Sequence, residues 1–328
     1  MASPGSLLYT EYTELVTTTL RNTKKEFADN VSNHNALFRR LTKKNKIRTT
    51  DGGLSISCPL EYAENGTFTR YSGLDPLNIA QSDVLTTAEF PWRSSAVNVV
   101  TSGEELRKNS GGNAILNLAK SRIKVAQKTM ANNLSNDIYS DGSLSNQING
   151  IQALVADTNT NTVGNISGNT WSFWRNGVQS AAAPIQGGGA ITVSATTFLS
   201  LMNPLWYQLT RGADQPDFIV SAIDYFTFFE NSQVANQRYA NSEDPNVAFT
   251  SMKYKGADVF FDASGSGIPA AHMYFLNTDY LEFCAHEDAF MEVMDDKTAV
   301  NQDGVVVPII TQGNLTVSNR ELQGVIKA

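Results

Sequence analysis

One long amphipathic segment constrains the fold more than any other feature of the chain. From about Asn113 to Tyr139, apolar residues recur at steps of three and four, the period of an α-helix with one continuous apolar face. Such a helix is roughly 40 Å long at 1.5 Å per residue, and Ser110-Gly111-Gly112 before it and Asp141-Gly142 after it are typical of helix ends. Its apolar positions are Ile115, Ala119, Ile123, Ala126, Met130, Leu134 and Ile138. Taken alone, the segment favours an ordinary long amphipathic helix over a spine that carries separate lobes.

A β-rich region precedes this helix. Alternation of apolar and polar residues predicts a strand over Leu54–Leu60, and Asn65-Gly66 predicts a hairpin turn with a return strand over Thr67–Tyr71. After a polar segment, further strands are predicted over Glu89–Arg93 and Val97–Val100. A ribbon of two or three strands is marginal in water. We therefore expect this ribbon to lie on another surface, for which a neighbouring subunit is a natural candidate.

The region after the long helix predicts a compact α/β lobe from about 145 to 285. Helices are expected over Ser194–Thr210, with a bend at Pro204, and over Ala222–Asn236. Strands are expected at 217–221, 257–261, 273–276 and 280–283 in the lobe, and at 305–310, 315–317 and 322–326 after it. The last of these strands would join a sheet begun earlier in the chain.

The charge distribution argues against a dedicated nucleic-acid binder. The chain of 328 residues has a net charge of −7, whereas such binders usually carry a basic face. Its first 50 residues hold nine Lys or Arg against four Asp or Glu, a net of +5, which leaves −12 for the remainder. Asymmetry of this kind often marks a segment with its own partner. The basic cluster of this segment consists of Arg39, Arg40, Lys43, Lys44, Lys46 and Arg48.

No catalytic or metal-binding pattern is evident in the sequence. The three histidines, His34, His272 and His286, are far apart, and the chain has neither a nucleophile elbow nor a zinc-binding helix. Gly187-Gly188-Gly189 lacks the lysine and the spacing of a phosphate loop. His286-Glu287-Asp288 is more typical of a solvated acidic surface than of a metal site. We therefore predict no enzyme activity, no cofactor and no metal.

The two cysteines, Cys58 and Cys284, are too few for a disulfide framework and lack metal-site spacing. Both lie in apolar, strand-like contexts, so we expect both to be reduced and buried. The N-terminus has no signal-peptide core, and no apolar run approaches the roughly 18 residues of a membrane span. These features predict a soluble protein made in a cytoplasm.

A series of short segments follows one another in a particular order along nearly the whole chain. They are Ile56–Tyr62, Thr69–Gly73, Leu85–Trp92, Asp137–Gly142, Lys253–Ala257 with Asp262, Tyr274–Leu281, Gly313–Arg320 and Gln323–Val325. In this order and at these spacings, they resemble the major capsid proteins of tailed bacteriophages, which have the Hong Kong 97-like fold. No segment is diagnostic alone.

The resemblance implies an α+β fold of the Hong Kong 97-like type. Its parts would be an N-terminal arm over 1–51, an extended β loop over 52–102, a peripheral domain with the long spine helix over 103–144 and 286–320, an axial domain over 145–285, and a C-terminal strand over 321–328. In that family the extended loop lies across a neighbour's peripheral domain, which agrees with the exposed ribbon expected above.

The resemblance also implies a structural function, that of a major capsid protein. Axial domains of the family gather round five-fold and six-fold axes, so one chain builds the pentamers and hexamers of an icosahedral shell around the double-stranded DNA of a tailed phage or prophage. The implied partners are other copies of the chain, a portal protein and packaged DNA without sequence specificity. A separate scaffold or cement protein is a further candidate partner, and no membrane is involved. The chain would be assembled in the host bacterial cytoplasm and reside in the virion.

Candidate contact residues follow from the general composition of interfaces, in which aromatics and arginines dominate. Arg70, Tyr71, Trp92 and Arg93 are the candidates for inter-subunit contact, and packing within their own subunit is the alternative for each. The basic cluster has two readings. It faces packaged DNA through counterion release, or it pairs with acidic residues of a neighbouring subunit, which we favour.

Two departures from the family and two alternative functions remain. No lysine occurs between Lys46 and Lys108, so we expect no isopeptide cross-link through the extended loop, and boiled particles should give an intact monomer band. The short N-terminal arm leaves no room for a cleavable scaffolding region.

The alternative within this fold is an encapsulin-like nanocompartment enclosing a cargo enzyme. A different class would be an α/β enzyme or a surface-binding protein, recognised as a stable monomer with a ligand-dependent melting shift.

Overall fold

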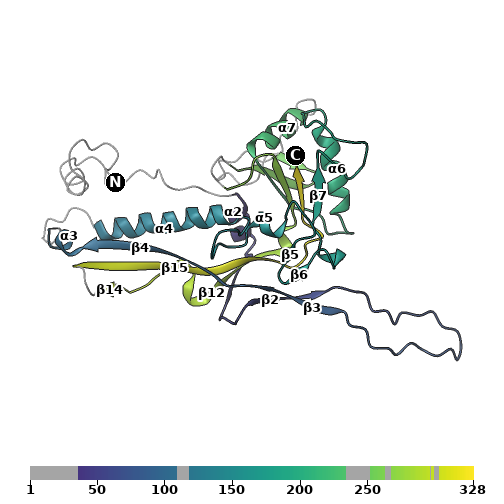
Figure 1. Ribbon diagram of the computed structural model, residues 1–328, viewed down its shortest axis with the longest axis horizontal. Coiled ribbons are helices and arrows are strands. Elements are labelled where there is room, and N and C mark those ends of the chain that lie inside the picture. Colours follow the sequence, from purple (N-terminus) through teal and green to yellow (C-terminus); the bar gives the residue numbers. More distant parts are fainter. Residues whose placement is uncertain (1–35, 109–117, 234–251, 263–266, 296, 299–302) are drawn as a thin grey trace. The chain divides into compact units, whose positions relative to one another are not determined.

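A computed structural model describes residues 36–108, 118–233, 252–262, 267–295, 297–298 and 303–328 (Figure 1). The chain divides into two compact units, each taken by itself here. The first comprises the described residues of 96–133 and 291–310, and the second those of 34–95, 134–290 and 311–328. His34, the expected helix start before Leu118 and the expected end of the second lobe helix after Gln233 lie outside the described residues.

The second unit contains a six-stranded mixed sheet. In spatial order its strands are β7 (Gly177–Ser180), β16 (Gly324–Lys327), β11 (His272–Leu276), β8 (Phe218–Ser221), β10 (Ala257–Phe261) and β9 (Met252–Tyr254). β16 runs parallel to β7 and antiparallel to β11, and β8 runs parallel to β10. The C-terminal strand therefore lies inside a sheet begun earlier in the chain, as predicted.

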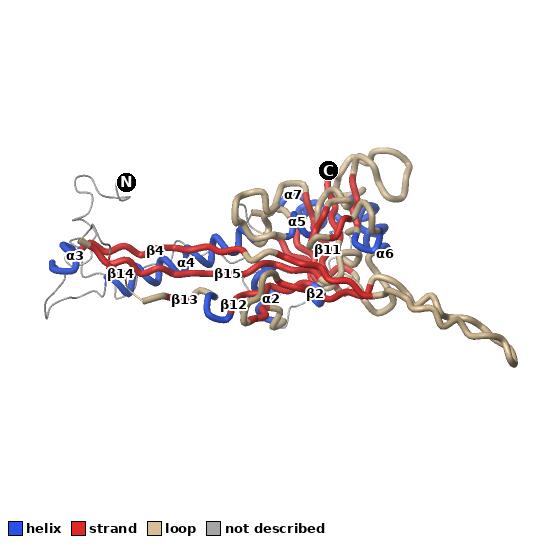
Figure 2. Tube along the Cα trace, turned by 60° about the horizontal axis from the view of Figure 1, so that its bottom comes forward, coloured by secondary structure: helices blue, strands red, loops and turns tan. Residues whose placement is uncertain are grey.

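Two helices pack against this sheet (Figure 2). α6 (Phe198–Gln208) contains Pro204 and contacts β7 and β16, and α7 (Ile223–Gln233) contacts β8, β10 and β11. The aromatic side chains of α7, among them Tyr225, Phe226 and Phe229, are buried in the core between these elements. Their spacing thus indicates packing, and the helices and strands predicted for this part of the chain are confirmed. The extent of the lobe, 145–285, stays a prediction.

The second sheet is built around one long strand, β15 (Gly304–Val317). In the second unit, β12 (Leu281–His286) lies between β1 (Ile47–Thr50), which is parallel to it, and β15, which is antiparallel. β15 is one continuous strand of 14 residues, where the sequence suggested two segments. The remaining short elements are α2 (Ala36–Lys43), α5 (Ile151–Leu154), β5 (Thr162–Val163), β6 (Ile166–Ser167), η1 (Ser172–Trp174), η3 (Thr278–Tyr280) and η4 (Glu287–Ala289).

The predicted hairpin between Leu54 and Tyr71 is wrong in its second strand. β2 (Ile56–Glu61) forms as expected, but its partner is β3 (Leu85–Phe90), and no strand forms over Thr67–Tyr71. The side-chain oxygen of Asn65 accepts hydrogen bonds from the backbone N–H and the hydroxyl of Thr67. A local turn of this kind competes with a strand ladder for the backbone donors, so 62–84 forms a long loop.

The first unit is built on β4 (Arg93–Ser102), α4 (Leu118–Asp137) and β15, each of which contributes residues to both units. α3 (Gly103–Lys108) follows β4, and β13 (Glu292–Val293) and β14 (Lys297–Thr298) pair with β15 in antiparallel register. Its small core joins Val99, Ala126, Met130 and Ile309, with Ile123 packed against them. The predicted apolar face of the long helix is therefore confirmed where the structure describes its side chains.

An ion pair holds α3 against α4 in this unit. The guanidinium of Arg122 donates to both carboxylate oxygens of Glu105, at 2.8 and 3.0 Å. This hydrogen bonding lowers the pKa of Glu105. Two parallel bonds give the pair a fixed orientation, so the start of the described part of α4 is held next to α3.

Candidate interaction site

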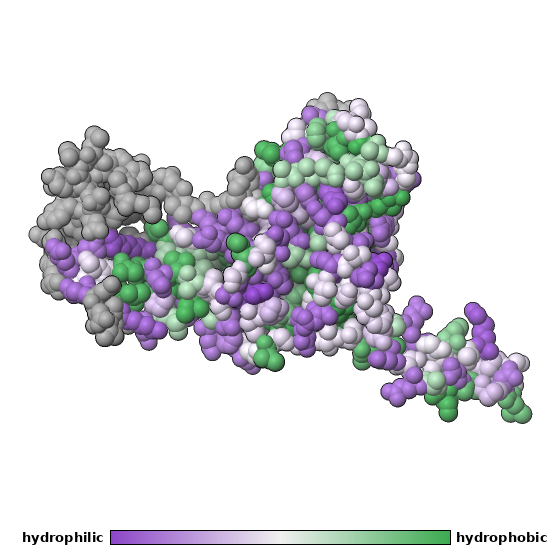
Figure 3. Space-filling view, viewed as in Figure 1, coloured by the Kyte–Doolittle hydropathy of each residue, from purple (hydrophilic) through white to green (hydrophobic). Residues whose placement is uncertain are grey.

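The loop segment 62–84, between β2 and β3, carries a run of large apolar side chains that are exposed. Leu74 and Ile79 are 102% and 93% exposed, and Phe68 is 77% exposed. The exposed apolar residues of this segment and its flanks are Leu54, Phe68, Tyr71, Leu74, Leu77, Ile79 and Leu85. Figure 3 shows hydrophobic surface along this projecting segment. Several large apolar side chains exposed on one segment indicate an interaction site.

The loop is nevertheless ordered by its own polar side chains. Asn65 also accepts a hydrogen bond from the Ser82 hydroxyl at 3.0 Å, which ties the two arms of the loop together. At the far end, the Asp75 carboxylate accepts from the Ser72 N–H at 3.0 Å. Polar groups thus shape the loop from within, while its apolar side chains are left for a surface outside the chain.

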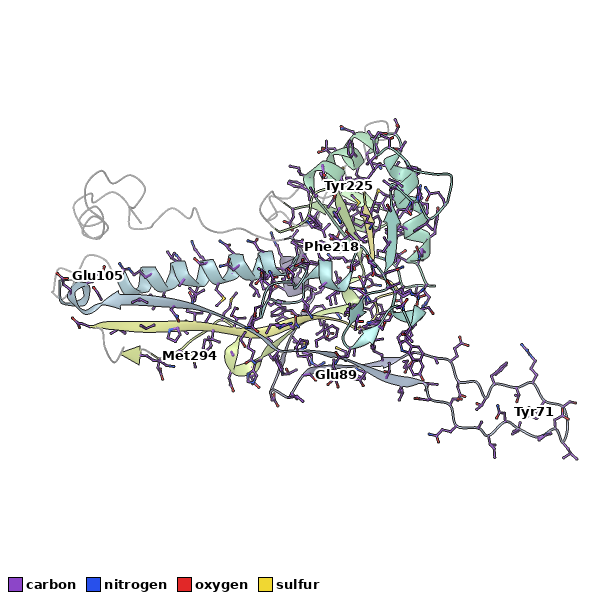
Figure 4. The ribbon with its side chains drawn as sticks, in the orientation of Figure 1. Tyr71, Glu89, Glu105, Phe218, Tyr225 and Met294 are labelled. Carbon is purple, nitrogen blue, oxygen red and sulfur yellow. The ribbon has the colours of Figure 1, made fainter. Side chains whose placement is uncertain are left out.

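Arg70 and Tyr71, two of the predicted contact residues, lie near the tip of this loop. The Arg70 guanidinium lies 5.5 Å from the centre of the Phe68 ring. Tyr71 is 65% exposed and lies at the far end of the loop in Figure 4. Both side chains are positioned to meet a partner, and their role in inter-subunit contact stays a prediction.

Trp92 and Arg93, the other two predicted contact residues, lie at the base of the loop. The Trp92 indole N–H donates to the Gly53 carbonyl at 2.9 Å, and its ring meets His286 edge-on at 5.9 Å. Arg93 is half-buried, and its Nε has no hydrogen-bond partner among the residues that the structure describes. The structure therefore separates the four residues into a tip pair and a base pair, and Trp92 has clear partners within its own chain.

The base of the loop is held by hydrogen bonds between its backbone and other segments of the second unit. The Asn314 amide donates to the Pro91 carbonyl at 2.9 Å, and the Glu89 N–H donates to the Gly164 carbonyl at 3.0 Å. A Cβ on Gly164 would lie 3.0 Å from Ala88, so the chain passes closely there. The exposed loop thus extends from a fixed base.

An aromatic cluster adds to the exposed surface beside this base. Tyr62 packs on Trp171 and Phe173 at ring distances of 5.5 and 5.8 Å. Trp171 remains 46% exposed. Aromatic residues of this kind are enriched at protein interfaces, so this cluster belongs to the candidate interaction site.

The basic cluster has partners within the chain that the sequence did not indicate. Arg40 pairs with Asp217 at 3.0 Å and with Asp258 at 3.5 Å, and Lys44 pairs with Asp217 at 2.8 Å. Burial opposes ionisation of Asp217, but hydrogen bonds from Lys44, Thr278 and Arg40 outweigh burial and lower its pKa. These pairs hold α2 and the residue that follows it against the β8 and β10 region of the second unit.

The other members of the basic cluster differ in their exposure. Lys44 also pairs with Asp279 at 3.1 Å, and Lys46 pairs with Glu282 at 3.8 Å. Arg39, Lys43 and Arg48 have exposed side chains. Contact of the cluster with DNA or with a neighbouring subunit stays a prediction for these exposed members.

Two buried polar centres of the second unit also escaped sequence reasoning. Arg320 is fully buried, and its guanidinium donates to the carbonyls of Leu154 and Trp174 and to the amide oxygens of Asn161 and Asn176, at 2.7 to 2.9 Å. Burial lowers the pKa of Arg320 to about 10. The second centre is a buried hydrogen bond of 2.6 Å from the Tyr139 hydroxyl to the Asp262 carboxyl.

The chemistry of the described residues gives no sign of a cofactor site. Within the described ranges, no group of three or more His, Cys, Asp or Glu side chains is placed to hold a metal ion. His272 pairs with Asp157 at 3.0 Å, whereas His286 accepts from the Asp288 N–H, so the two described histidines have different partners. Both cysteines are free. Cys284 is buried as predicted, but Cys58 is only half-buried, because β2 lies at the base of an exposed loop.

No helix among the described residues combines the length and the apolar character needed to cross a membrane.

No protein-family model matches the sequence. A comparison with curated proteins also finds no match.

Solved structures match the chain over almost its whole length. The capsid asymmetric unit of cyanophage A-1(L) is similar with a TM-score of 0.60 and 16% identity, covering 94% of this chain and 98% of that one. The capsid of a native GTA particle is similar with a TM-score of 0.56 and 13% identity, covering 94% and 95%. The SrpI encapsulin of Synechococcus elongatus PCC 7942 is similar with a TM-score of 0.54 and 8% identity, covering 95% and 94%. At these identities the likeness concerns the fold, and the chain has the mixed helix-and-sheet fold of phage capsid proteins, as its sequence resemblance predicted.

Proposed function

We propose that this chain is the major capsid protein of a tailed phage or prophage. The observation that carries the proposal is the loop segment 62–84, whose apolar side chains the chain itself leaves exposed. The capsid fold of the matched structures supports the same function. A fold shared with shell proteins and an exposed apolar loop together point to assembly of many copies of one chain.

The exposed loop gives assembly a physical driving force. Burying a Leu, Ile or Phe side chain contributes about 1.5–3 kcal/mol, and the loop offers Phe68, Leu74, Leu77 and Ile79. Association costs translational and rotational freedom and the ordering of side chains, so one loop contact is modest. Each copy in a shell makes several such contacts, and the loop would lie across a neighbouring copy.

The proposed architecture is that of the Hong Kong 97-like fold. The N-terminal arm occupies 1–51, the extended β loop 52–102, the peripheral domain 103–144 and 286–320, and the axial domain 145–285, with the C-terminal strand at 321–328. Arg70 and Tyr71 at the loop tip, with Trp92 and Arg93 at its base, are the proposed inter-subunit contacts. Of the basic cluster, Arg39, Lys43 and Arg48 are proposed to meet a neighbouring subunit.

The proposed partners and place follow from the proposed function. Copies of the chain form pentamers and hexamers of a shell that encloses double-stranded DNA without sequence specificity. A portal protein occupies one vertex, and a separate scaffold or cement protein is a further partner. Assembly takes place in the host bacterial cytoplasm, the product is the virion, and the role is structural rather than enzymatic.

Electron microscopy of the purified full-length chain tests the proposal. The chain is expressed alone and together with the neighbouring genes of its phage or prophage, and particles are purified and stained. Closed shells of several hundred ångströms that contain DNA, measured by nuclease-protected absorbance at 260 nm, are the expected result. Shells filled with protein would identify a nanocompartment of the encapsulin kind instead. Monomers at every concentration, in both expression schemes, would overturn the proposal.

A further inference from the structure

The two cysteines lie close together in the folded chain, although 226 positions separate them in the sequence. Cys284 lies on β12, and its thiol is 3.8 Å from the Thr316 hydroxyl on the neighbouring strand β15. Cys58 lies on β2, at the base of the exposed loop, where Ile56 is opposite Phe90 and the carbonyl of the next residue, Pro91, accepts a hydrogen bond from Asn314. Asn314 is opposite Cys284, so the base of the loop lies against the strand that carries Cys284. Thr316 and Cys284 both influence the pKa of the Cys58 thiol, which agrees with this placement.

The sheet register explains why the thiols meet at this point. Residues opposite each other on neighbouring strands share a face, as do residues two apart on one strand. Arg48 is opposite Cys284, and Glu282 is opposite Thr316. Arg48, Glu282, Cys284 and Thr316 therefore share one face of the β1-β12-β15 sheet.

Cys58 reaches that same face from another part of the chain. Its thiol lies within the electrostatic range of Glu282, Arg48 and Cys284, and the thiol of Cys284 has Glu282 and Arg48 as neighbours too. Figure 1 and Figure 2 draw β2 and β12 near each other. Both thiols thus have Glu282 and Arg48 as common neighbours. Among the described residues, no group of three or more His, Cys, Asp or Glu side chains is placed to hold a metal ion there.

We infer that Cys58 and Cys284 are a site of oxidative modification, at which an intrachain disulfide closes and fixes the base of the exposed loop to the β1-β12-β15 sheet. The oxidant is a low-molecular-weight disulfide. The half-buried Cys58 thiolate attacks one sulfur of this oxidant and releases one small thiol. The Cys284 thiolate then attacks the Cys58 sulfur of the mixed disulfide and releases the second small thiol. Two protein thiols are oxidised, and one small disulfide is reduced to two thiols.

The surroundings of the thiols set the conditions for this reaction. Burial raises the pKa of both thiols, and the thiolate is the attacking form, so closure accelerates as the pH rises above neutrality. Cytosolic thiols are kept reduced, so the disulfide forms after the protein reaches an oxidising medium. A disulfide within one chain would form whether or not the chain assembles into shells, so its test is separate from that of the proposed function.

The test measures the equilibrium between the full-length chain and glutathione. Native chain is incubated in buffers of defined ratios of oxidised to reduced glutathione, quenched with acid, and analysed by intact mass and peptide mapping. The expected product is about 2 Da lighter than the reduced chain and gives one linked peptide pair containing Cys58 and Cys284. The effective concentration of the two thiols should be at least tenfold higher in native buffer than in guanidinium chloride.

The controls use the same chain. Cys58→Ser and Cys284→Ser should each abolish the lighter species, and a reductant should restore the original mass. The oxidised chain should unfold at a temperature at least about 5 °C higher than the reduced chain, because closing so long a loop constrains the unfolded state. Glutathione adducts on both cysteines without a protein disulfide, or equal effective concentrations in native buffer and denaturant, would overturn the inference.

Discussion

The hydroxyl of Tyr139 donates a hydrogen bond of 2.6 Å to the Oδ2 of Asp262, and both side chains are buried. Asp262 has no cationic partner in the contacts described for it; its other contact is the Ala36 N–H at 3.5 Å, where α2 begins. Burial raises the pKa of Asp262 to about 6, against the opposing hydrogen bonds from Tyr139 and Ala36. The folded chain thus prefers the protonated form of this carboxyl over the range in which the unfolded chain ionises it.

This preference predicts a pH-dependent stability. Because the pKa of Asp262 is raised in the folded state, its contribution is fully present below the unfolded pKa of about 4 and is lost as the pH rises through about 6. The free energy of unfolding of the wild-type chain, relative to Asp262→Asn, should fall by on the order of 2–3 kcal/mol between pH 4 and pH 7. Urea denaturation of the unassembled chain at each pH measures this difference.

Tyr139→Phe is the matched control. It removes the hydrogen bond that favours the carboxylate, so the fall in the free energy of unfolding should move to higher pH. Parallel profiles for the wild type and Asp262→Asn would contradict the assignment.

A second prediction concerns Arg320, whose planar guanidinium donates hydrogen bonds to four acceptors. Arg320→Lys keeps the charge but replaces the fork with a single ammonium, which leaves buried acceptors without donors. We expect a loss of about 3–5 kcal/mol in the free energy of unfolding, measured by urea denaturation. Arg211→Lys is the control, because Arg211 is exposed and bonds only at the surface; it should change stability by less than about 0.5 kcal/mol. Equal effects of the two substitutions would show that the Arg320 contacts are not what stabilises this region.

Some of these features could be predicted from the sequence and others could not. The period of three and four residues around Ala126 and Met130 reports burial directly, so the long helix was predictable. The return strand predicted at Thr67–Tyr71 is wrong, because the Asn65 side chain accepts the hydrogen bonds of the Thr67 N–H and hydroxyl. The Asn-Gly turn signal in the sequence does not reveal this local contact. Periodicity in the sequence shows which face of a helix or strand is buried, but it does not show which distant element covers that face.

The residues of the candidate interaction site were likewise predictable only in part from the sequence. Arg70 and Tyr71 were chosen from residue type and proved to lie on an exposed loop. The pairing of Arg40 with Asp217, residues 177 positions apart, depends on tertiary structure and has no local pattern. A charge cluster therefore predicted a partner for Arg40 but not that the partner is in the same chain.

The third prediction rests on two glycines that face each other across parallel strands. Gly177 of β7 lies opposite Gly324 of β16, and a Cβ on Gly324 would lie 2.6 Å from the side chain of Leu209, which directly follows α6. Gly324→Ala should therefore cost about 1–3 kcal/mol of stability through overpacking. Thermal and urea unfolding measure it, with Gly66→Ala as control, since the nearest atom to a Cβ there is 3.9 Å away.

A double variant separates overpacking from a backbone effect at Gly324. Leu209→Ala alone opens a cavity and should cost about 2–5 kcal/mol. Combined with Gly324→Ala, part of that cavity is filled, so the double variant should lose clearly less than the sum of the two single losses. Strict additivity would mean that the added methyl group does not meet Leu209.

The last prediction tests the loop that carries the proposed function. Leu74→Ser with Ile79→Ser removes two fully exposed apolar side chains and leaves the Asn65 and Asp75 hydrogen bonds of the loop intact. Since 1.4 kcal/mol is a factor of ten in association, and each buried side chain contributes about 1.5–3 kcal/mol, the concentration needed for shell formation should rise at least tenfold. Sedimentation velocity and electron microscopy over a concentration series measure it. Leu144→Ser is the matched control, because Leu144 is 67% exposed but lies outside the loop. The unfolding midpoint of the unassembled double variant should stay that of the wild type; a large drop, or assembly at the wild-type concentration, would mean that the loop's apolar side chains do not serve contact between copies.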